Sequence, residues 1–354
     1  MNTNIFTLYN INYLEKYNKF ICMFKNYNIS VKDVIPDHLE SKYEEDLSLC
    51  IEELKSEDND YNFHKVYENH VFFLNNLKPA KINTLAYKAF LEIEKNEVVK
   101  SNLLAFKPFK GFANVVRYNL SNTVTGRLTV NQGPNILTLP NRCRKIFESR
   151  WGSNGSLLSV DFKNLEPRFV KKILGENVEN DIYNEILNML DFKEEIDRSL
   201  IKKAVISVMY GKSTPIEGIS LKRSEIILQT TKDYFNLHKI YEIANVKYFE
   251  KYRRNYFGRP ILNYNEEKSN KIINNFIQSS AVDLAMIYFN QLINTFDESL
   301  TKPCFVIHDA FIVDVHNNYL DTFYKITCNG YNHDKLGNFP IEITHFTTGE
   351  KLSV

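Results

Sequence analysis

The sequence predicts an α+β fold in which apolar strands end at acidic residues and long helices lie between them. Two apolar runs carry this prediction: residues 157–160 lead directly into Asp161, and residues 304–307 lead through a turn to Asp309. Between these runs, apolar residues recur at the spacings of three and four that are typical of helices. With 354 residues, the chain can bury a large core and is expected to form about two or three lobes.

The first part of the chain, residues 1–105, is predicted to be a helical N-terminal lobe. Apolar residues have helical spacing between residues 47 and 54, and the same period returns between residues 82 and 104. Pro108 and Gly111 then indicate a change to extended chain, so we place a boundary near residue 105.

The elements that follow are predicted to alternate between strand and helix. The strand that ends at Asp161 is followed by a charged helix to about residue 174. Asp197 is a suitable N-cap for a helix that runs to Met209, with Gly211 just beyond its end. Long helices are expected over residues 221–250 and 266–296, after which Pro303 introduces a hairpin with an acid at its tip.

The total charge gives no indication of a nucleic-acid partner, because 44 Lys and Arg residues nearly balance 43 Asp and Glu residues. The charges are unevenly distributed, however: residues 37–60 are mostly acidic, whereas charged residues between 107 and 150 are mostly basic. A neutral total can therefore hide a basic cleft. The acidic segment either faces a partner protein or keeps the N-terminal lobe soluble.

Cysteine usage predicts a reducing, cytoplasmic compartment. No Cys-x-x-Cys pair is present, so we expect neither a zinc site nor a disulfide framework. The N-terminus is polar, and no apolar run reaches the length of a membrane span, so no membrane partner is expected. The scattered cysteines are Cys22, Cys50, Cys143, Cys304 and Cys328.

Asp161 and Asp309 are candidate metal ligands. Carboxylates at the ends of neighbouring strands can hold two Mg²⁺ ions roughly 3.5 to 4 Å apart, as phosphoryl transfer requires. The alternative is that each aspartate is a solvated turn residue. The segment between them adds a possible phosphate site, because Arg198, Lys202 and Ile206 share one helical face. Cations backed by apolar surface suit a triphosphate, although a solvated basic face above the core has the same pattern.

Three motifs, in this order, resemble those of family A DNA polymerases, the group that includes bacterial DNA polymerase I. Residues 161–168 (DFKNLEPR) are similar to motif A, Asp-Tyr-Ser-Gln-Ile-Glu-Leu-Arg, with its Asp, Glu and Arg in register. Arg198, Lys202 and Tyr210-Gly211 match motif B, and Ile307-His308-Asp309 before an apolar strand matches motif C. Other positions between about 115 and 354 also match family counterparts: residues 125–128 (TGRL), Pro134-Asn135, Pro140, Arg142, residues 256–259 (YFGR), Asn274 and Gln278.

The resemblance implies a right-hand polymerase fold with an antiparallel-sheet palm, helical fingers and a reduced helical thumb. It implies template-dependent addition of dNTPs to a primer 3′-hydroxyl. No proofreading exonuclease is expected, because the roughly 115 residues before the matching region are too few to hold one. The expected partners of this monomer are a DNA primer-template and dNTPs, with two Mg²⁺ ions that Mn²⁺ can replace. A replication protein could bind the N-terminal lobe. The implied segments are an N-terminal lobe or reduced thumb at 1–105, first palm part at 106–180, fingers at 181–265 and second palm part at 266–354.

The resemblance also implies roles for the residues of the reaction centre. Asp161 and Asp309, with the backbone carbonyl of Phe162, would bind the metals. Arg198 and Lys202 would hold the triphosphate, and Lys202 would also donate a proton to the leaving pyrophosphate.

Further residues are implied to select the nucleotide and bind the duplex. Glu166, packed against Tyr210, would occupy the space that a ribose 2′-hydroxyl needs, so that deoxynucleotides are preferred. Tyr210 would stack near the templating position. Contacts with the primer-template are implied for Arg127, Asn274, Gln278 and His308, with His308 near the primer terminus.

The sequence departs from the family at several positions. Ala310 stands where a glutamate usually follows the motif C aspartate, which predicts reduced activity rather than none. Ile206 replaces an aromatic residue that faces the incoming sugar, and Asn270 replaces an arginine that contacts the duplex. Motifs A and B begin at 161 and 198, and this short separation predicts trimmed fingers.

Two other functions remain open. Ala310 and Ile206 would permit a nucleotidyltransferase with relaxed specificity, which uses NTPs, adds nucleotides without a template or bypasses lesions. The other alternative is a catalytically silent module that binds primer-template or a replication protein. The presence of both aspartates, Arg198 and Lys202 argues against a silent module.

Overall fold

The computed structural model describes most of the chain. Cys22 and the end of the predicted acidic segment, residues 58–60, lie outside the described residues, as do parts of the predicted boundaries near 180 and 265. The described residues are 4–17, 20, 31, 34–57, 62–178, 181–211, 215–248, 252–262 and 268–352.

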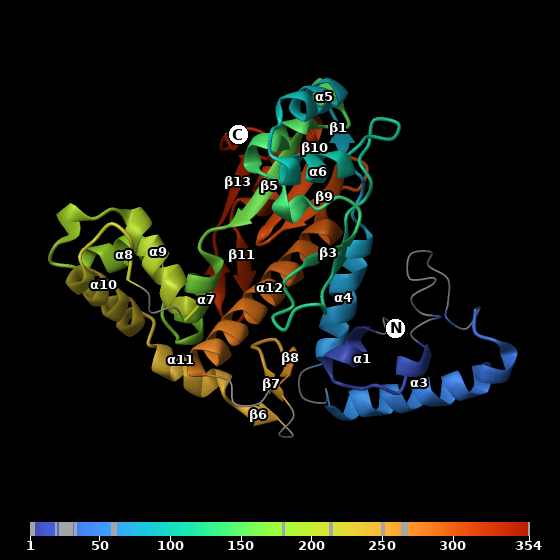
Figure 1. The fold of residues 1–354 in the computed structure, drawn as a ribbon, viewed down its shortest axis with the longest axis horizontal. Helices are drawn as coiled ribbons and strands as arrows, with labels where there is room; N and C mark the ends of the chain where they lie inside the picture. The colour runs from blue at the N-terminus through green and yellow to red at the C-terminus, as the bar shows by residue number, and fades with distance from the viewer. Residues whose placement is uncertain are drawn as a thin grey trace.

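Four antiparallel strands form the central sheet, in the order β13-β5-β10-β9 (Figure 1). Helices surround this sheet, so the predicted α+β class is confirmed. The predicted hairpin is also present, because β9 and β10 pair through a two-residue turn at His308 and Asp309. The strands are β5 (Gly155–Phe162), β9 (Thr301–Ile307), β10 (Ala310–His316) and β13 (Ile341–His345).

Pro303 lies inside β9 rather than before it, which differs from the prediction. A proline cannot donate a backbone hydrogen bond, so strands tolerate it mainly at sheet edges or irregularities. β9 meets both conditions: it is the edge strand, and its pairing with β10 shifts register between Ile312 and Val313.

The two faces of the sheet enter two separate cores. On one face, α12 (Ser269–Thr295) and α4 (Phe63–Asn75) pack against β10. The ring centroid of Phe311 lies 5.2 Å from that of Phe73 and 5.3 Å from that of Phe289. The N-terminal segment therefore contributes to the main core.

The second core lies on the opposite face of the sheet and receives side chains from α5 (Thr84–Ile93) and α6 (Glu97–Ala105). Leu157 of β5 belongs to this core. Because side chains alternate along a strand, Asp161 lies on the same face as Leu157, at the end of the sheet. Phe162 points to the other face, where its ring lies 5.4 Å from Tyr288 of α12.

Helices α8, α9, α10 and α11 form a group on one side of the sheet (Figure 1). The predicted start of α9 is confirmed, because the Asp197 side chain accepts a hydrogen bond from the Leu200 amide at 2.9 Å. Gly211, just past the end of α9, has a φ of 67° that suits glycine. The helices are α8 (Ile182–Asn188), α9 (Arg198–Met209), α10 (Leu221–Tyr234) and α11 (Leu237–Ala244).

The prediction of one long helix over residues 221–250 is wrong. Asn236 has a φ of 42°, in the left-handed region, and separates α10 from α11 as the N-cap of the second helix. Asparagine tolerates this conformation better than most residues. The chain then becomes extended in β6 (Lys247–Tyr248). The predicted helix over 266–296 is present as α12 within the described residues.

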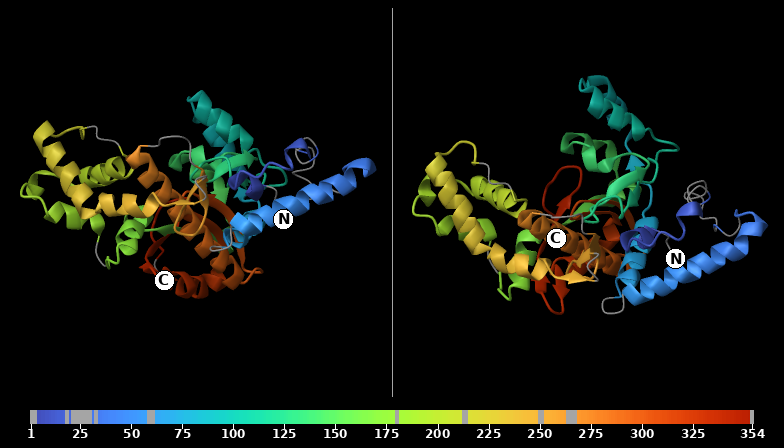
Figure 2. Two further views of the ribbon diagram at one scale, coloured as in Figure 1. Left: turned by 90° about the horizontal axis from the view of Figure 1, so that it is seen from below. Right: turned by 60° about the horizontal axis from the view of Figure 1, so that its bottom comes forward.

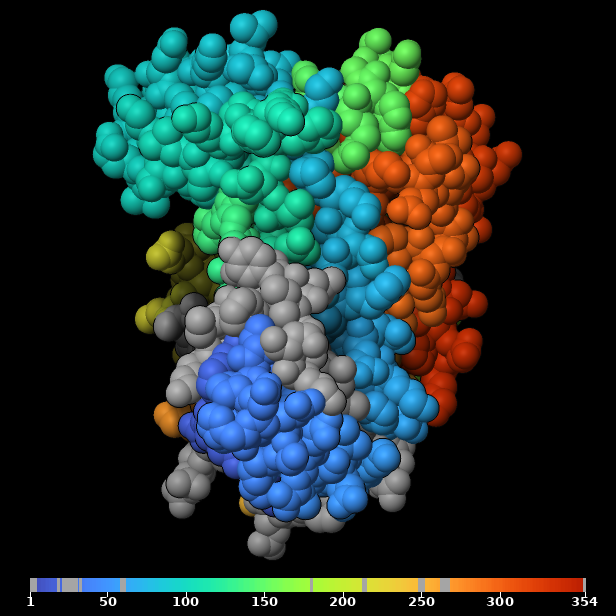
Figure 3. Space-filling view, turned by 90° about the vertical axis from the view of Figure 1, so that its right-hand side faces the viewer, coloured from blue at the N-terminus to red at the C-terminus, as the bar shows by residue number. Residues whose placement is uncertain are grey.

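Helix α3 (Asp37–Glu57) projects from the body on the side opposite α8 to α10 (Figure 2). Figure 3 shows α4 as a column between α3 below and the segment with α5 and α6 above. The described helices include none with both the length and the apolar composition to cross a membrane. The predicted segment boundaries stay predictions.

The other elements are short and connect the main ones. The helices are α1 (Asn4–Leu8), α7 (Leu165–Ile173), α13 (Leu320–Thr327) and the 3₁₀ turns at Glu15–Tyr17, Ile136–Thr138, Asn141–Ile146, Gly152–Asn154, Lys193–Glu195 and Asn317–Tyr319. The strands are β1 (Lys81–Ile82), β2 (Arg117–Asn119), β3 (Thr129–Gln132), β4 (Phe147–Glu148), β7 (Tyr252–Arg254), β8 (Pro260–Leu262), β11 (Tyr331–His333) and β12 (Gly337–Phe339).

Candidate active site

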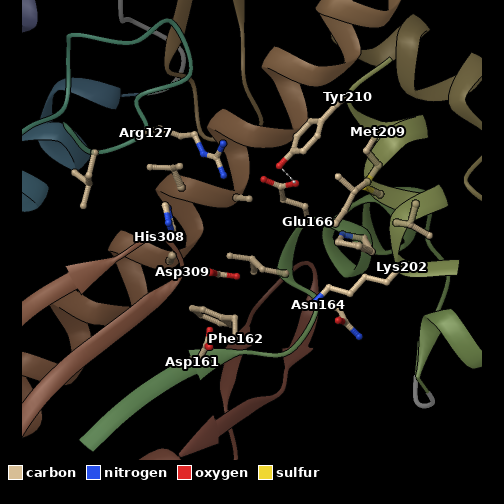
Figure 4. A pocket seen from close by; sticks show the side chains of 18 of the residues that line it. Arg127, Asp161, Phe162, Asn164, Glu166, Lys202, Met209, Tyr210, His308 and Asp309 are labelled. Atoms are coloured by element: carbon tan, nitrogen blue, oxygen red, sulfur yellow. Dashed lines mark hydrogen bonds between the residues drawn. The ribbon is translucent and has the colours of Figure 1, made fainter. Parts of the chain in front are cut away.

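A cleft of about 470 Å³ opens where β5 ends and β9 turns into β10 (Figure 4). Its walls come from the sheet end, α7, α9, α12 and the loop before β3. Most of the predicted site residues meet here, although the two that are farthest apart, Arg127 and Asp309, are separated by 182 positions in the sequence. The predicted residues that line the cleft are Arg127, Asp161, Phe162, Glu166, Lys202, Ile206, Tyr210, His308 and Asp309.

The two aspartates reach the cleft from adjacent parts of the sheet. Asp161 is the second-last residue of β5, and Asp309 occupies the turn between β9 and β10. His308, beside Asp309, has a φ of 56°, a left-handed conformation that is uncommon for a residue with a side chain. The Phe162 amide donates a hydrogen bond of 3.4 Å to the Asp309 carbonyl, so the turn is tied to the end of β5.

Both aspartates are held in surroundings that disfavour their ionised forms. Burial raises the pKa of Asp161 to about 7, and the negative charges of Asp309 and Glu342 add to this effect. Burial also raises the pKa of Asp309. Neither carboxylate forms a salt bridge with any residue that the structure describes. A bound cation would therefore relieve an unfavourable concentration of negative charge.

These acids fit divalent cations that take most of their ligands from elsewhere. Within the described residues, no three His, Cys, Asp or Glu side chains are grouped so that they alone could hold a metal ion. Mg²⁺ is commonly bound through one or two carboxylates, with water and substrate phosphates completing its coordination. Asp161 and Asp309 can supply those carboxylates, and backbone carbonyls at the end of β5 can add oxygen ligands.

Helix α9 places Lys202 and Ile206 in the wall of the cleft, and Figure 4 shows Lys202 extending from the helix toward the end of the sheet. Arg198, one turn earlier, is not part of this cleft. Its guanidinium forms a salt bridge of 2.6 Å with Asp181. Arg198 and Asp181 instead line a neighbouring cavity of about 570 Å³, which also includes Asp161.

Glu166 and Tyr210 lie together on the far wall of the cleft (Figure 4). The Tyr210 hydroxyl donates a hydrogen bond of 3.4 Å to the Glu166 carboxylate. Burial raises the pKa of Glu166, although the positive charge of Arg127 acts in the opposite direction. Burial also lowers the pKa of His308, which favours a neutral imidazole in the cleft.

The loop that carries Arg127 packs against a buried ion pair. Gly126 has a φ of 68°, and a side-chain carbon there would lie 2.5 Å from the Arg259 guanidinium. Only glycine therefore fits this position. Arg259 is fully buried and forms a salt bridge of 2.6 Å with Asp283 of α12. Arg127 is thus placed by contacts that extend into the core.

Two predicted duplex-binding residues lie outside the cleft. Asn274 and Gln278 belong to α12, toward its N-terminus from the residues Ala281 and Ala285 that line the cleft. The Gln278 side chain donates a hydrogen bond of 2.8 Å to Asn274, so the two form a pair on one side of the helix. Their roles in binding a duplex stay predictions.

The sequence predictions missed residues that surround Asp161. Glu342 of β13 is paired with Asp161 in register, and Lys351 binds Glu342 at 2.6 Å. Arg144 is half-buried, its Nε lacks a hydrogen-bond partner in the described structure, and the negative charge of Asp161 acts on it. Apolar and polar residues alternate around Glu342, which predicts a strand, but the sequence does not show which strand it pairs with.

The comparisons with known proteins support the fold. No model of a protein family matches the sequence, and no curated protein matches it. A solved structure, the POL domain of Pol1 from M. smegmatis in complex with DNA primer-template and dNTP, is similar with a TM-score of 0.57 and 16% sequence identity. The match covers 72% of this chain and 52% of that chain, so this chain spans about half of that length. The matched part of the chain therefore has a fold similar to that polymerase domain, which belongs to a family A DNA polymerase.

Proposed function

We propose that this chain is a DNA polymerase, which adds dNTPs to the 3′-hydroxyl of a primer as a template directs. The observation that carries the proposal is that Asp161, Asp309 and Lys202 face one cleft in a fold similar to a polymerase domain. Two carboxylates that form no salt bridge with a described residue, opposite a lysine, suit a triphosphate that is bound together with divalent cations.

Asp161, Asp309 and the backbone carbonyl of Phe162 would hold two Mg²⁺ ions, which Mn²⁺ could replace. When bound, such ions activate the attacking 3′-hydroxyl and neutralise charge on the phosphates. The protein's own contribution is to fix both carboxylates at the sheet end before substrate arrives. The hydrogen bond from the Phe162 amide to the Asp309 carbonyl supports this fixed arrangement.

Lys202 and Arg198 would bind the triphosphate from α9. Lys202 is in the cleft and would donate a proton to the leaving pyrophosphate. Arg198 is paired with Asp181 in a partly exposed salt bridge, and it would exchange this partner for a phosphate when the nucleotide binds. Such an exchange costs little, because exposed salt bridges contribute only about 0 to 1 kcal/mol.

Glu166 and Tyr210 would select deoxynucleotides. Their hydrogen bond keeps the Glu166 side chain against the wall of the cleft, where it would exclude a ribose 2′-hydroxyl. Tyr210 would also stack near the templating base. Arg127 and His308, which line the same cleft, would contact the primer-template, and Asn274 and Gln278 would extend that contact along α12.

A nucleotidyltransferase with relaxed specificity is the second candidate, and Ile206 favours it. This side chain lines the cleft and is 43% exposed, so an aliphatic group stands where an incoming sugar would meet an aromatic ring in the family. Ala310 also leaves a methyl group beside Asp161 in place of an acid. NTP use, template-free addition and lesion bypass are the activities that such changes would permit.

Primer extension tests these proposals. Purified chain is incubated with a labelled primer-template, each dNTP or NTP, and Mg²⁺ or Mn²⁺, beside Asp161→Ala and Asp309→Ala. We expect templated dNTP addition by the wild type and none by the variants. Addition of NTPs, or addition without a template, would support the relaxed-specificity candidate. If the wild type is inert but binds duplex as tightly as both variants do, the silent binding module is the correct function.

A further inference from the structure

Asp161 has an in-register neighbour on each side in the central sheet. Ala310 of β10 is opposite it on one side, and Glu342 of β13 is opposite it on the other. Residues directly opposite one another in antiparallel strands point to the same face, with their Cβ atoms about 5 Å apart. Asp161 therefore has a methyl group on one side and a carboxylate on the other.

Asp161 is also shared by two neighbouring cavities that contain different acids. Besides Asp161, the cleft of about 470 Å³ contains Asp309 and Glu166, whereas the cavity of about 570 Å³ contains Glu342 and Asp181, which is paired with Arg198. The second cavity continues to Arg198, one of the two residues that would bind phosphate under the proposed function, whereas the other, Lys202, lines the cleft. Glu342 thus lies on the Arg198 side of Asp161, and Asp309 lies on the side of His308 and Lys202.

Glu342 is already paired with a positively charged side chain in this structure. Lys351 forms a salt bridge of 2.6 Å with it, and the Lys351 side chain is 76% exposed. Both residues line the second cavity. An exposed lysine is held only weakly in such a pair, so a divalent cation bound by Asp161 could displace it.

We propose that Glu342 is a metal-binding residue, which with Asp161 holds one ion on the side of Arg198, while Asp161 and Asp309 hold the other ion. This inference rests on the proposed function and extends it. Within the described residues no three His, Cys, Asp or Glu side chains are grouped so that they alone could hold a metal ion, so each ion would take only two acids from the chain. This assignment also explains how the site can function with Ala310: the third acid comes from the opposite neighbour of Asp161.

Binding of Mn²⁺ to the full chain, followed by electron paramagnetic resonance of the free ion, tests the assignment. We expect two Mn²⁺ ions on the wild type and about tenfold or greater weakening of one of them in Glu342→Gln. Glu350→Gln is the matched control, because Glu350 is an exposed acid of the same C-terminal segment that lines neither cavity. It should bind both ions as the wild type does.

Two additional variants separate a metal-binding role from a structural one. Lys351→Met removes the competing cation at an exposed position, so it should tighten Mn²⁺ binding at the Glu342 site. Ala310→Glu combined with Glu342→Gln places a carboxylate on the other side of Asp161 and should restore the weakened site. A purely structural Glu342 would change the unfolding temperature without changing either Mn²⁺ affinity.

The outcomes distinguish this inference from the proposed function. If Asp161→Asn loses Mn²⁺ but Glu342→Gln binds both ions normally, Glu342 is not a metal-binding residue and the polymerase proposal is unaffected. If Glu342→Gln loses one ion but the wild type never extends a primer, the polymerase proposal fails and the Glu342 assignment holds. A wild type that binds no Mn²⁺ overturns the assignment.

Discussion

Two acidic sites in this molecule have opposite surroundings: one at the buried Asp283, and one at the half-buried Asp161 and Asp309. Asp283, in the middle of α12, accepts hydrogen bonds from Arg259 at 2.6 and 2.9 Å and from Asn255 at 2.7 Å, and its carboxylate lies 3.2 Å from His70. Asp161 has no such partner among the described residues. Burial opposes ionisation of Asp283, but Arg259 outweighs it and lowers the pKa, whereas burial raises the pKa of Asp161 to about 7.

The difference indicates which acid has a structural role and which acid needs a partner from outside the chain. At Asp283 the protein supplies a buried counter-charge, and the resulting network joins α4, α12 and the residues before β8. Asp161 has no such counter-charge in contact with it among the described residues. The more distant charges of Lys202 and Arg144 act to lower its pKa, but they do not offset the effect of burial. Perturbed, unpaired acids in a cleft are typical of functional sites.

Replacement of Asp283 should have the largest effect on stability. Asp283→Ala leaves the fully buried Arg259 without its partner, and breaking a buried pair in this way costs about 3 to 5 kcal/mol. Asp309→Ala is the contrasting variant, because it removes an acid that has no salt bridge with a described residue and should cost far less. Urea unfolding without metal measures both. Equal losses of unfolding free energy in the two variants would show that Asp283 contributes no more to stability than Asp309 does.

Replacement of Asp161 should have the largest effect on activity with little effect on the fold. Asp161→Asn keeps the size of the side chain but removes the charge, so primer extension should fall by more than about 100-fold. Asp321→Asn, at an exposed acid in the first turn of α13, is the control and should retain full activity. If Asp161→Asn extended primers as fast as the control, Asp161 would not be a metal ligand.

The pH dependence of stability should also distinguish the two sites. Because the pKa of folded Asp161 is about 7, above its ordinary value of 3.8, the folded chain retains a proton that the unfolded chain releases in this window. Without metal, stability should therefore fall as pH rises from about 4 to about 7. The lowered pKa of Asp283 applies only to the folded chain, so Asp283 is ionised in both states above about pH 5 and adds a slope of the opposite sign only below that pH.

The comparison of wild type with Asp161→Asn isolates this contribution. Burial lowers the pKa of His70, which reduces stability as pH falls below the ordinary histidine value, but this effect is present in both chains and cancels. The wild-type free energy of unfolding, relative to that of the variant, should decrease by at least about 1.4 kcal/mol between about pH 4 and pH 8. A constant difference between the two chains would contradict the raised pKa.

The sequence predicted local features of the site more completely than its long-range contacts. Asp197 and Gly211 determine the ends of α9 through local capping, and the apolar run before Asp161 forms a strand as expected. The place of Glu342 beside Asp161 depends on the pairing of β13 with β5, which lies far away in the sequence. A period of two predicts a strand but does not indicate its neighbour.

Side-chain partners were the other limit of sequence-based prediction. Arg198 was expected at a triphosphate, but the packing of α8 against α9 places Asp181 within 2.6 Å of it. Arg259 belongs to a segment that matched the family, but nothing in the sequence showed that it forms a buried pair with Asp283, because burial and pairing arise only when α12 packs in the core. Their spacing alone does not predict a salt bridge.

Arg198 should show the smallest effect on stability and a specific effect on nucleotide binding. Its salt bridge with Asp181 is partly exposed, so Arg198→Gln should change the free energy of unfolding by at most about 1 kcal/mol. The KM for dNTP should rise about tenfold, as expected for the loss of one charge-assisted hydrogen bond.

Arg223→Gln is the matched control, since Arg223 forms a similar exposed salt bridge of 2.6 Å with Glu195. Steady-state primer extension gives both KM values, and an equal rise in the two variants would mean that Arg198 contributes only general positive charge. A rise in KM that is confined to Arg198→Gln would show that Arg198 leaves Asp181 to bind the nucleotide, whereas Arg259 stays paired with Asp283.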